Sequence, residues 1–182
     1  MTTSQPTRLN LVEEPILRVG PWEVKEMVLT WDKVEHLWET MKKYKTLFSD
    51  LTRNDFSNFF KSITRPNTLW FEVWNGNSEI VGLVWLSDIE MTVDGSAHMV
   101  FFDRQPAEKQ LVCQALIKWV FKHYPLHRVT VTTPAIYFAT QRMLRRMGFT
   151  LEGTKREAVL MDGKWVDVQF YGMTRNEVEV MP

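Results

Sequence analysis

Three short apolar segments joined by tight turns limit the folds that are open to this chain. The segments "TLWFEVW" (68–74) and "EIVGLVWLSDIEM" (79–91) flank "NGNS", and an Asn-Gly pair is typical of a β-hairpin turn. Asp94-Gly95 predicts a second turn before "SAHMVFF" (96–102). Three consecutive antiparallel strands therefore favour a sheet at the centre of the fold.

Two amphipathic helices are expected before these strands. Apolar side chains recur at spacings of three and four within residues 30–44, and Thr30 is a suitable N-cap. Residues 52–63 repeat the pattern, with Thr52 and Asp55 in the spacing of a capping box. The aromatic side chains on these faces indicate either ordinary core packing or a substrate groove between the two helices.

Two further helices are expected after the strands, with a short strand at 127–133 between them. The helix at 106–124 is apolar around most of its circumference, so we expect it to be covered on two sides. For the helix at 134–147, the spacing predicts an inward face. This face would consist of Ile136, Ala139, Met143 and Met147.

The segment "MLRRMGFTLEG" (143–153) indicates where that helix ends. Gly148 is expected at the position after the last helical residue, where a left-handed backbone is cheap only for glycine. A final hairpin closed by Asp162-Gly163 should follow. With strands at 16–20 and 22–29, the predicted class is α+β with a mixed, mostly antiparallel sheet flanked by helices.

Composition restricts the compartment and the partners. Lysine plus arginine equal aspartate plus glutamate at 22 each, which gives no argument for nucleic acid as a bulk partner. No apolar stretch reaches the roughly 20 residues that span a bilayer, and no signal peptide is recognised. The only cysteine is Cys113, so we expect an inert core thiol and a cytoplasmic protein. We expect one domain over residues 1–182, with 1–13 as a flexible arm.

The end of the chain, "RMLRRMGFTLEGTKREAVLMDGKWVDVQFYGMTRNE", carries a family resemblance. Together with the predicted element order, it resembles the GCN5-related N-acetyltransferases (GNAT). It is most similar to the branch that acetylates ribosomal-protein or other protein N-termini and some small amines. The matching positions are Gly148-Phe149, Glu152-Gly153, Arg156, Asp162-Gly163, Asp167, Tyr171-Gly172 and Glu177. The resemblance implies a GNAT-like fold that holds acetyl-CoA where two central strands part.

The resemblance also assigns cofactor-binding positions. In this family, a loop at the start of the third helix binds the pyrophosphate through glycines. Here Gln105 occupies its first position, whereas Glu108 and Gln110 stand where the glycines are expected, so the pyrophosphate loop is degenerate. Glu108 would place a negative charge beside the diphosphate, which Arg104 and Lys109 could offset. The implied cofactor-binding set is Val100, Phe101, Phe102, Arg104, Gln105, Ala107, Glu108, Lys109 and Gln110.

Three residues are candidates for acid–base chemistry at the implied reaction centre. His98 is the candidate base, because the ordinary pKa of histidine suits proton transfer at neutral pH. Glu90, on the adjoining strand, could deprotonate an amine through water, and Tyr137 could protonate the departing thiolate. Each also has an ordinary structural interpretation. His98 could be a hydrogen-bonded histidine, Glu90 a solvated strand residue, and Tyr137 a packing or capping residue.

Other motifs give little support to other functions. His123 and His127 have the spacing of a helical metal pair, but Pro125 breaks the helix between them, so we expect no metal site. The "RMLRR" run favours a solvated helix end over contact with nucleic acid or with the phosphate of a cofactor.

Two functions from different classes therefore remain. The first is an acyl-CoA-dependent N-acetyltransferase that acts on a primary amine, either a protein N-terminus or a small molecule. The second is a non-catalytic GNAT-fold binding or assembly protein, of the kind found in tailed phages. A homodimer is compatible with both functions.

Overall fold

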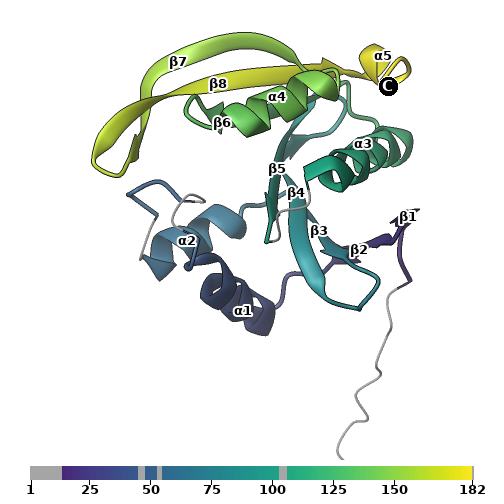
Figure 1. Cartoon of the computed structure of the whole chain (residues 1–182), viewed down its shortest axis with the longest axis horizontal. Coiled ribbons are helices and arrows are strands. Elements are labelled where there is room, and N and C mark those ends of the chain that lie inside the picture. The colour runs from purple at the N-terminus through teal and green to yellow at the C-terminus, as the bar shows by residue number, and fades with distance from the viewer. Residues whose placement is uncertain (1–13, 45–47, 53–54, 103–105, 182) are drawn as a thin grey trace, which may run out of the picture.

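A computed structural model describes residues 14–44, 48–52, 55–102 and 106–181, and its centre is an eight-stranded sheet (Figure 1). The strands lie in the order β1-β2-β3-β4-β5-β6-β8-β7, and every neighbouring pair is antiparallel except β5 and β6. Their bounds are β1 Leu17–Val19, β2 Trp22–Met27, β3 Leu69–Trp74, β4 Ile80–Glu90, β5 Asp94–Phe101, β6 Arg128–Pro134, β7 Thr150–Met161 and β8 Lys164–Thr174. The expected α+β class with a mostly antiparallel sheet is confirmed.

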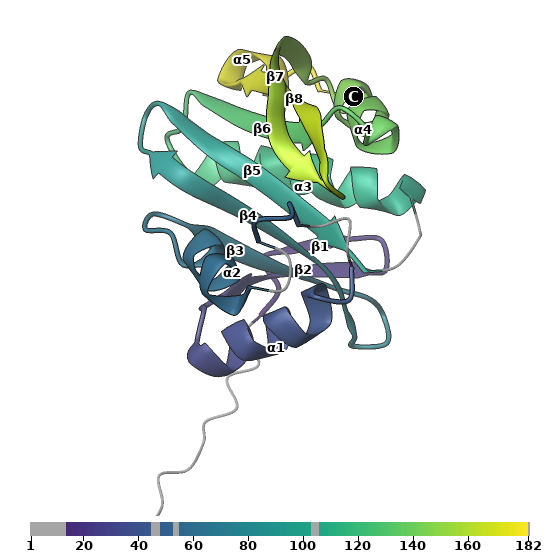
Figure 2. The same cartoon turned by 90° about the vertical axis from the view of Figure 1, so that its left-hand side faces the viewer.

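The helices cover both faces of the sheet (Figure 2). They are α1 Trp31–Met41, α2 Phe56–Ile63, α3 Pro106–His123, α4 Phe138–Arg146 and a short α5 Arg175–Val178. One apolar cluster joins α1 and α2 to one face, and another joins α3 and α4 to the opposite face. The predicted strand at 96–102 is thus packed between helices on two sides, and the strand at 127–133 packs against the α3 and α4 side.

The first two helices pack through their aromatic side chains. The Trp38 ring lies 5.1 Å from Phe59 and 5.8 Å from Phe56. Trp31 remains 55% exposed although its ring contacts Phe60. Thr30 caps α1 by accepting from the Lys33 amide. The core-packing interpretation therefore describes this interface, because the rings contact one another across it.

Two local predictions were wrong, one about the N-cap of α2 and one about the turn between β4 and β5. The N-cap of α2 is Asp55, which accepts from the Asn58 amide at 2.9 Å, whereas Thr52 lies in a turn before the helix. The turn between β4 and β5 consists of residues 91–93, with Thr92 at φ +68°, and Asp94 already pairs with Glu90. In both cases an aspartate side chain accepts from a nearby backbone amide: Asp55 from Asn58, and Asp94 from Gly95. These hydrogen bonds fix where α2 and β5 begin.

The inward face of α4 also differs from the prediction. Ile136 is 48% exposed and Ala139 is exposed, while Gln141, Leu144 and Met147 are buried. The helix begins only at Phe138, after an N-cap at Tyr137, so Ile136 lies outside it. The inward positions of Met143, which is half-buried, and of Met147 agree with the prediction. The buried Gln141 side chain is satisfied because its amide donates to the carbonyl of Ala135.

The end of α4 agrees with the prediction. Gly148 has φ +95°, a conformation that costs little only for glycine. Its amide and that of Phe149 bind the last carbonyls of the helix, on Arg145 and Leu144. Phe149 is then buried in the core. The hairpin that follows turns at Asp162-Gly163, as predicted, and arches over the α2 side of the molecule (Figure 1).

Some predictions cannot be compared with the structure. The arm at 1–13 and the residues Arg104 and Gln105 lie outside the described residues.

Among the described residues, no helix is both long enough and apolar enough to cross a membrane. The same part of the chain contains no group of three or more histidine, cysteine or acidic side chains arranged to hold a metal ion.

Candidate functional site

Strands β5 and β6 diverge at the centre of the sheet. They are parallel and in register only at Ser96 and Thr130. Beyond that point, residues 97–101 of β5 pair with β4, and residues 131–134 of β6 pair with β8. The sheet therefore opens into a wedge between two strands that are otherwise fully paired on their outer sides.

Two adjoining cavities occupy this wedge. We call the first the inner cavity: it measures about 660 Å³ and is lined by Trp85, residues 97–99, residues 131–134 and residues 136–140. We call the second the outer cavity: it measures about 600 Å³ and lies between β5, α3 and α4. Met99, Ala139 and Thr140 line both. Together they form a continuous path of the size that small-molecule ligands occupy.

The outer cavity is lined by positive charge. Lys109 at the start of α3 and Arg142 and Arg146 on α4 all border it, together with Gln110 and residues 99–101. No acidic side chain is among the described residues that line it. The Lys109 ammonium lies 5.3 Å above the Phe101 ring, a cation–π contact that holds both side chains at the cavity wall. Three cations around one opening favour an anionic ligand.

Glu108 is turned away from this opening. Its carboxylate accepts a hydrogen bond of 3.1 Å from the Trp22 indole on β2. It does not line the outer cavity, whereas its neighbours Lys109 and Gln110 do. The effect of the Glu108 charge on a bound diphosphate stays a prediction. Gln110 does border the cavity, where its amide can donate a hydrogen bond.

His98 lies at the inner cavity and is hydrogen-bonded from behind. Its Nε2 is 2.9 Å from the hydroxyl of Ser87, which is itself buried and donates to Asp88 at 2.9 Å. Because the one hydroxyl proton goes to Asp88, Ser87 accepts from Nε2–H, and the lone pair of the imidazole is on Nδ1. Burial is the main cause that lowers the pKa of His98; Asp88 opposes it and Arg65 reinforces it. Neutral imidazole is thus favoured.

A β-bulge positions the carboxylate in this chain of contacts. The register between β4 and β5 shifts between Ser87 and Glu90, and Asp88 adopts φ +51°. This strained conformation lets Asp88 reach both the Ser87 hydroxyl and the Arg65 guanidinium, the latter at 3.0 Å. Backbone strain of this kind often accompanies a functional site.

The other two acid–base candidates are separated by the fold. Tyr137 is the N-cap residue of α4 and lines the inner cavity with His98. Its hydroxyl also lies 3.8 Å from the Met161 sulfur, at the end of β7. Glu90 instead lines a different cavity, beside Asn67 and Met91 at the far end of β4. The structure thus brings His98 and Tyr137 together and leaves Glu90 outside.

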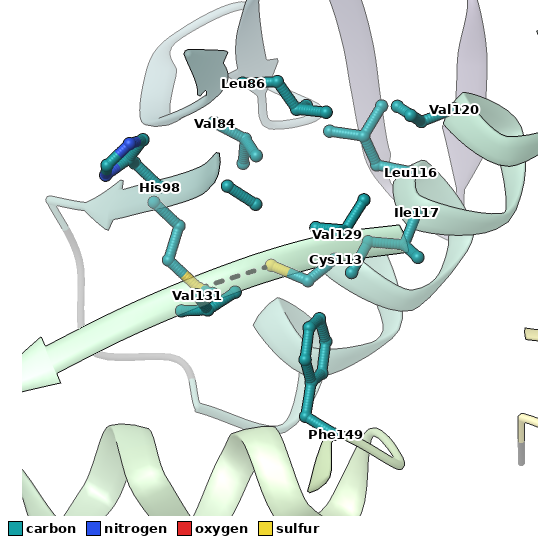
Figure 3. A pocket seen from close by; sticks show the side chains of 12 residues that line it. Val84, Leu86, His98, Cys113, Leu116, Ile117, Val120, Val129, Val131 and Phe149 are labelled. Atoms are coloured by element: carbon teal, nitrogen blue, oxygen red, sulfur yellow. Dashed lines mark hydrogen bonds between the residues drawn. The ribbon is translucent and has the colours of Figure 1, made fainter. Parts of the chain in front are cut away.

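Cys113 is a buried thiol on the α3 side of the sheet. Its sulfur lies 3.7 Å from the Met99 sulfur, within an apolar shell whose enclosed space is only about 20 Å³. Figure 3 shows this shell, with the imidazole of His98 turned away from Cys113. Burial raises the pKa of the thiol to about 12, so it stays protonated at neutral pH and is a poor nucleophile. The expectation of an inert core thiol is confirmed.

Asp50 fastens the tip of the last hairpin to the segment between α1 and α2. Its two carboxylate oxygens accept from the amides of Asp162 and Gly163 at 2.9 and 2.7 Å. Its own amide donates to the Leu160 carbonyl. These contacts hold the arch of β7 and β8 over the α2 side of the sheet, the face on which Trp85 and His98 lie (Figure 1).

Replacing Asp50 with Ala should release the hairpin tip. Hydrogen bonds to a charged acceptor contribute about 1.5–3 kcal/mol each when sheltered, and less here because the site is exposed. We therefore expect amide exchange at Asp162 and Gly163 to accelerate about tenfold. NMR-detected exchange measures this directly.

The control is Asp55→Ala, which removes another aspartate from the same connection. It should loosen the α2 N-terminus, because its carboxylate accepts from Asn58, and leave the hairpin amides unchanged. Unchanged exchange at Asp162 in the Asp50 variant would show that the carboxylate does not hold the tip.

Sequence reasoning missed Ser87, Asp50 and Trp85. Ser87 carries no local motif, and its contact with His98 exists only because β4 and β5 pair with Trp85 opposite His98. Asp50 reaches a turn that lies 112 residues later. The arginines of α4 were noticed in the sequence, but their position beside Lys109 depends on how α3 and α4 pack.

Comparisons with known proteins place the fold. No family model matches the chain, and no curated protein matches it in sequence. Among solved structures, a chimera of spermidine N-acetyltransferase SpeG from Vibrio cholerae and hSSAT aligns with a TM-score of 0.72 at 14% identity. It covers 86% of this chain and 98% of the chimera.

Two further solved structures give the same result. The spermidine/spermine N-acetyltransferase SpeG from Vibrio cholerae aligns at 0.70 and 14% identity, over 86% of this chain and 96% of that one. A protein described as "probable acetyltransferase" aligns at 0.63 and 18% identity, over 85% and 94%. At these identities the likeness shows the fold alone, and the expected GNAT-like fold is confirmed.

Proposed function

We propose that this chain is an acyl-CoA-dependent N-acetyltransferase that acts on a primary amine. The observation that carries the proposal is the wedge between β5 and β6, with a cation-lined cavity at one end and His98 at the other. Acetyl-CoA, when bound, supplies the acetyl group as a thioester. The solved structures that resemble this chain carry the names of acetyltransferases, which supports the same class of reaction.

The outer cavity would hold the phosphates of the cofactor. Lys109, Arg142 and Arg146 supply cations, and Gln110 supplies a donor. Residues 99–101 of β5 line this cavity, where backbone groups can bind the pantetheine arm, whereas Phe102 lines a different cavity beside α1. The Glu108 carboxylate is held by Trp22 and is not among the side chains that line this cavity.

The inner cavity would hold the reacting groups. His98 takes a proton from the attacking amine through its Nδ1 lone pair, while Ser87 and Asp88 keep the ring in the required tautomer. Tyr137 gives its hydroxyl proton to the departing sulfur, since it lines the same cavity. The buried, protonated Cys113 favours direct transfer in a ternary complex over a covalent enzyme intermediate.

Thermal melting with and without acetyl-CoA tests the proposal. A ligand at about 100 times its dissociation constant stabilises the native state by about 2.7 kcal/mol. For a chain of this size, the midpoint should then rise by about 5–10 °C. Release of free CoA thiol in the presence of an amine would demonstrate the transfer. A midpoint that does not move at millimolar acetyl-CoA would favour the non-catalytic binding or assembly protein.

A further inference from the structure

An aromatic ladder crosses the sheet and ends at the inner cavity. Trp70, Trp85 and His98 are opposite one another on β3, β4 and β5. Their rings stack nearly parallel, at 4.8 Å and 17° for the tryptophan pair and 4.9 Å and 13° for Trp85 and His98. Because the two faces of Trp85 are covered by Trp70 and His98, Trp85 borders the inner cavity with the edge of its ring, beside the candidate base.

The opposite wall of the inner cavity is also apolar. Ile136 and Phe138 line it although they are 48% and 71% exposed, so large apolar side chains stand in solvent at its mouth. Exposed apolar side chains gathered at a cavity are typical of a ligand site. The cavity thus has an aromatic ring edge at Trp85 and exposed apolar side chains at Ile136 and Phe138.

The inner cavity lacks a carboxylate among the described residues that line it. The acidic side chains of the flanking strands are engaged elsewhere. Asp88 pairs with Arg65, Asp94 accepts from Thr130, and Glu90 borders a different cavity. A second ammonium group held against this lining would therefore have no anionic partner, which is unfavourable.

We propose that the acceptor is a small arylalkylamine, a primary amine with one nitrogen on an aromatic body, and not a polyamine. The proposal rests on the N-acetyltransferase function proposed above. The aromatic ring packs between the edge of Trp85 and the side chain of Phe138, because both faces of Trp85 are already covered by Trp70 and His98, and this places the amine nitrogen beside His98. The nitrogen loses a proton to His98 and forms the amide bond as the thioester C–S bond breaks. The sulfur leaves with a proton from Tyr137.

Competition between amines tests the proposal. The probes are 2-phenylethylamine, butylamine, spermidine and a tripeptide that begins with serine, each with saturating acetyl-CoA. We expect kcat/KM for 2-phenylethylamine to exceed that of the other three by about tenfold or more. An equal or higher value for spermidine would overturn the inference, and so would an equal or higher value for the tripeptide. In either case the transferase activity itself would stand.

A variant and a binding measurement complete the test. Phe138→Ser should lower the preference for 2-phenylethylamine over butylamine about threefold or more without disturbing the core, because Phe138 is 71% exposed. If no amine is acetylated, calorimetric titration of the protein with 2-phenylethylamine and with spermidine still decides. Tighter binding of 2-phenylethylamine would support the acceptor class and overturn the transferase, and binding that does not favour it would overturn the inference.

Discussion

Replacing His98 with Gln is expected to lower kcat/KM for amine acetylation about 100-fold. Glutamine retains a planar side chain that can hydrogen-bond to Ser87, but it has no basic nitrogen to take the amine proton. The thermal shift with acetyl-CoA should be unchanged, because His98 lies in the inner cavity and not beside the cations. Initial rates of CoA release together with melting curves measure both effects.

The pH profile gives a second signature of the same residue. Burial lowers the pKa of His98 from its ordinary value of 6.5, so the neutral base persists to lower pH than in a free histidine. The pH at which kcat/KM declines on the acid side should therefore lie below 6.5, and activity should be lost as the pH falls through the pKa of His98. This acid limb should disappear in His98→Gln.

Two variants separate catalysis from packing. His123 is matched to His98 as a histidine stacked on a tryptophan, here Trp119, but it lies on α3 outside both cavities. His123→Gln should leave kcat/KM within about twofold. Ser87→Ala should lower kcat about tenfold and displace the acid limb, because it uncouples the imidazole from Asp88. If His123→Gln were as damaging as His98→Gln, the assignment of the base would be wrong.

Local chemistry made most of the fold predictable from the sequence. The Asp162-Gly163 turn and Gly148 each require a left-handed backbone that few residues adopt, so they locate the ends of elements without tertiary information, whereas in the Asn-Gly turn the positive φ falls on Ser78. Thr30, as the N-cap, located the start of α1. These signals fixed the element order, and the order led to the GNAT-like fold that the solved structures share.

The start of a helix was predicted wrongly where the preceding residues are held by another element of the fold. The pattern at 134–147 looked continuous, yet Pro134 belongs to β6 and the helix starts at Phe138, so Ile136 lies outside the helix, and Gln141 and Leu144 are buried together with Met147. The pattern also could not show that Gln141 would be buried, since its partner is the Ala135 carbonyl in the preceding loop.

The candidate site was predicted less completely than the fold. His98 was singled out because its strand was expected at the reaction centre, and it does line the inner cavity. The role of Glu108 could not be read, because the indole that engages it is 86 residues away on β2. Trp85 and Ser87 look like ordinary strand residues until β4 is aligned with β5.

Reversing the charge of both arginines at the outer cavity should abolish most of the affinity for acetyl-CoA. Arg142 and Arg146 border that cavity, and neither has a recorded ion-pair partner within the described residues. Loss of two charge-assisted contacts at about 1.5–3 kcal/mol each predicts a rise in Kd of about 100-fold or more for Arg142→Glu/Arg146→Glu. Titration calorimetry at low ionic strength measures the change.

The matched control for this pair is Arg145→Glu. Arg145 is exposed in the same last turn of α4 but does not line the outer cavity. Its reversal carries the same penalty per charge with the helix dipole, about 0.3–1 kcal/mol, and should raise Kd less than about threefold. Added salt should narrow the difference between the variants, because the Debye length falls to about 3 Å at 1 M. Equal weakening by Arg145→Glu would mean that the general field of α4, and not a phosphate site between α3 and α4, attracts the cofactor.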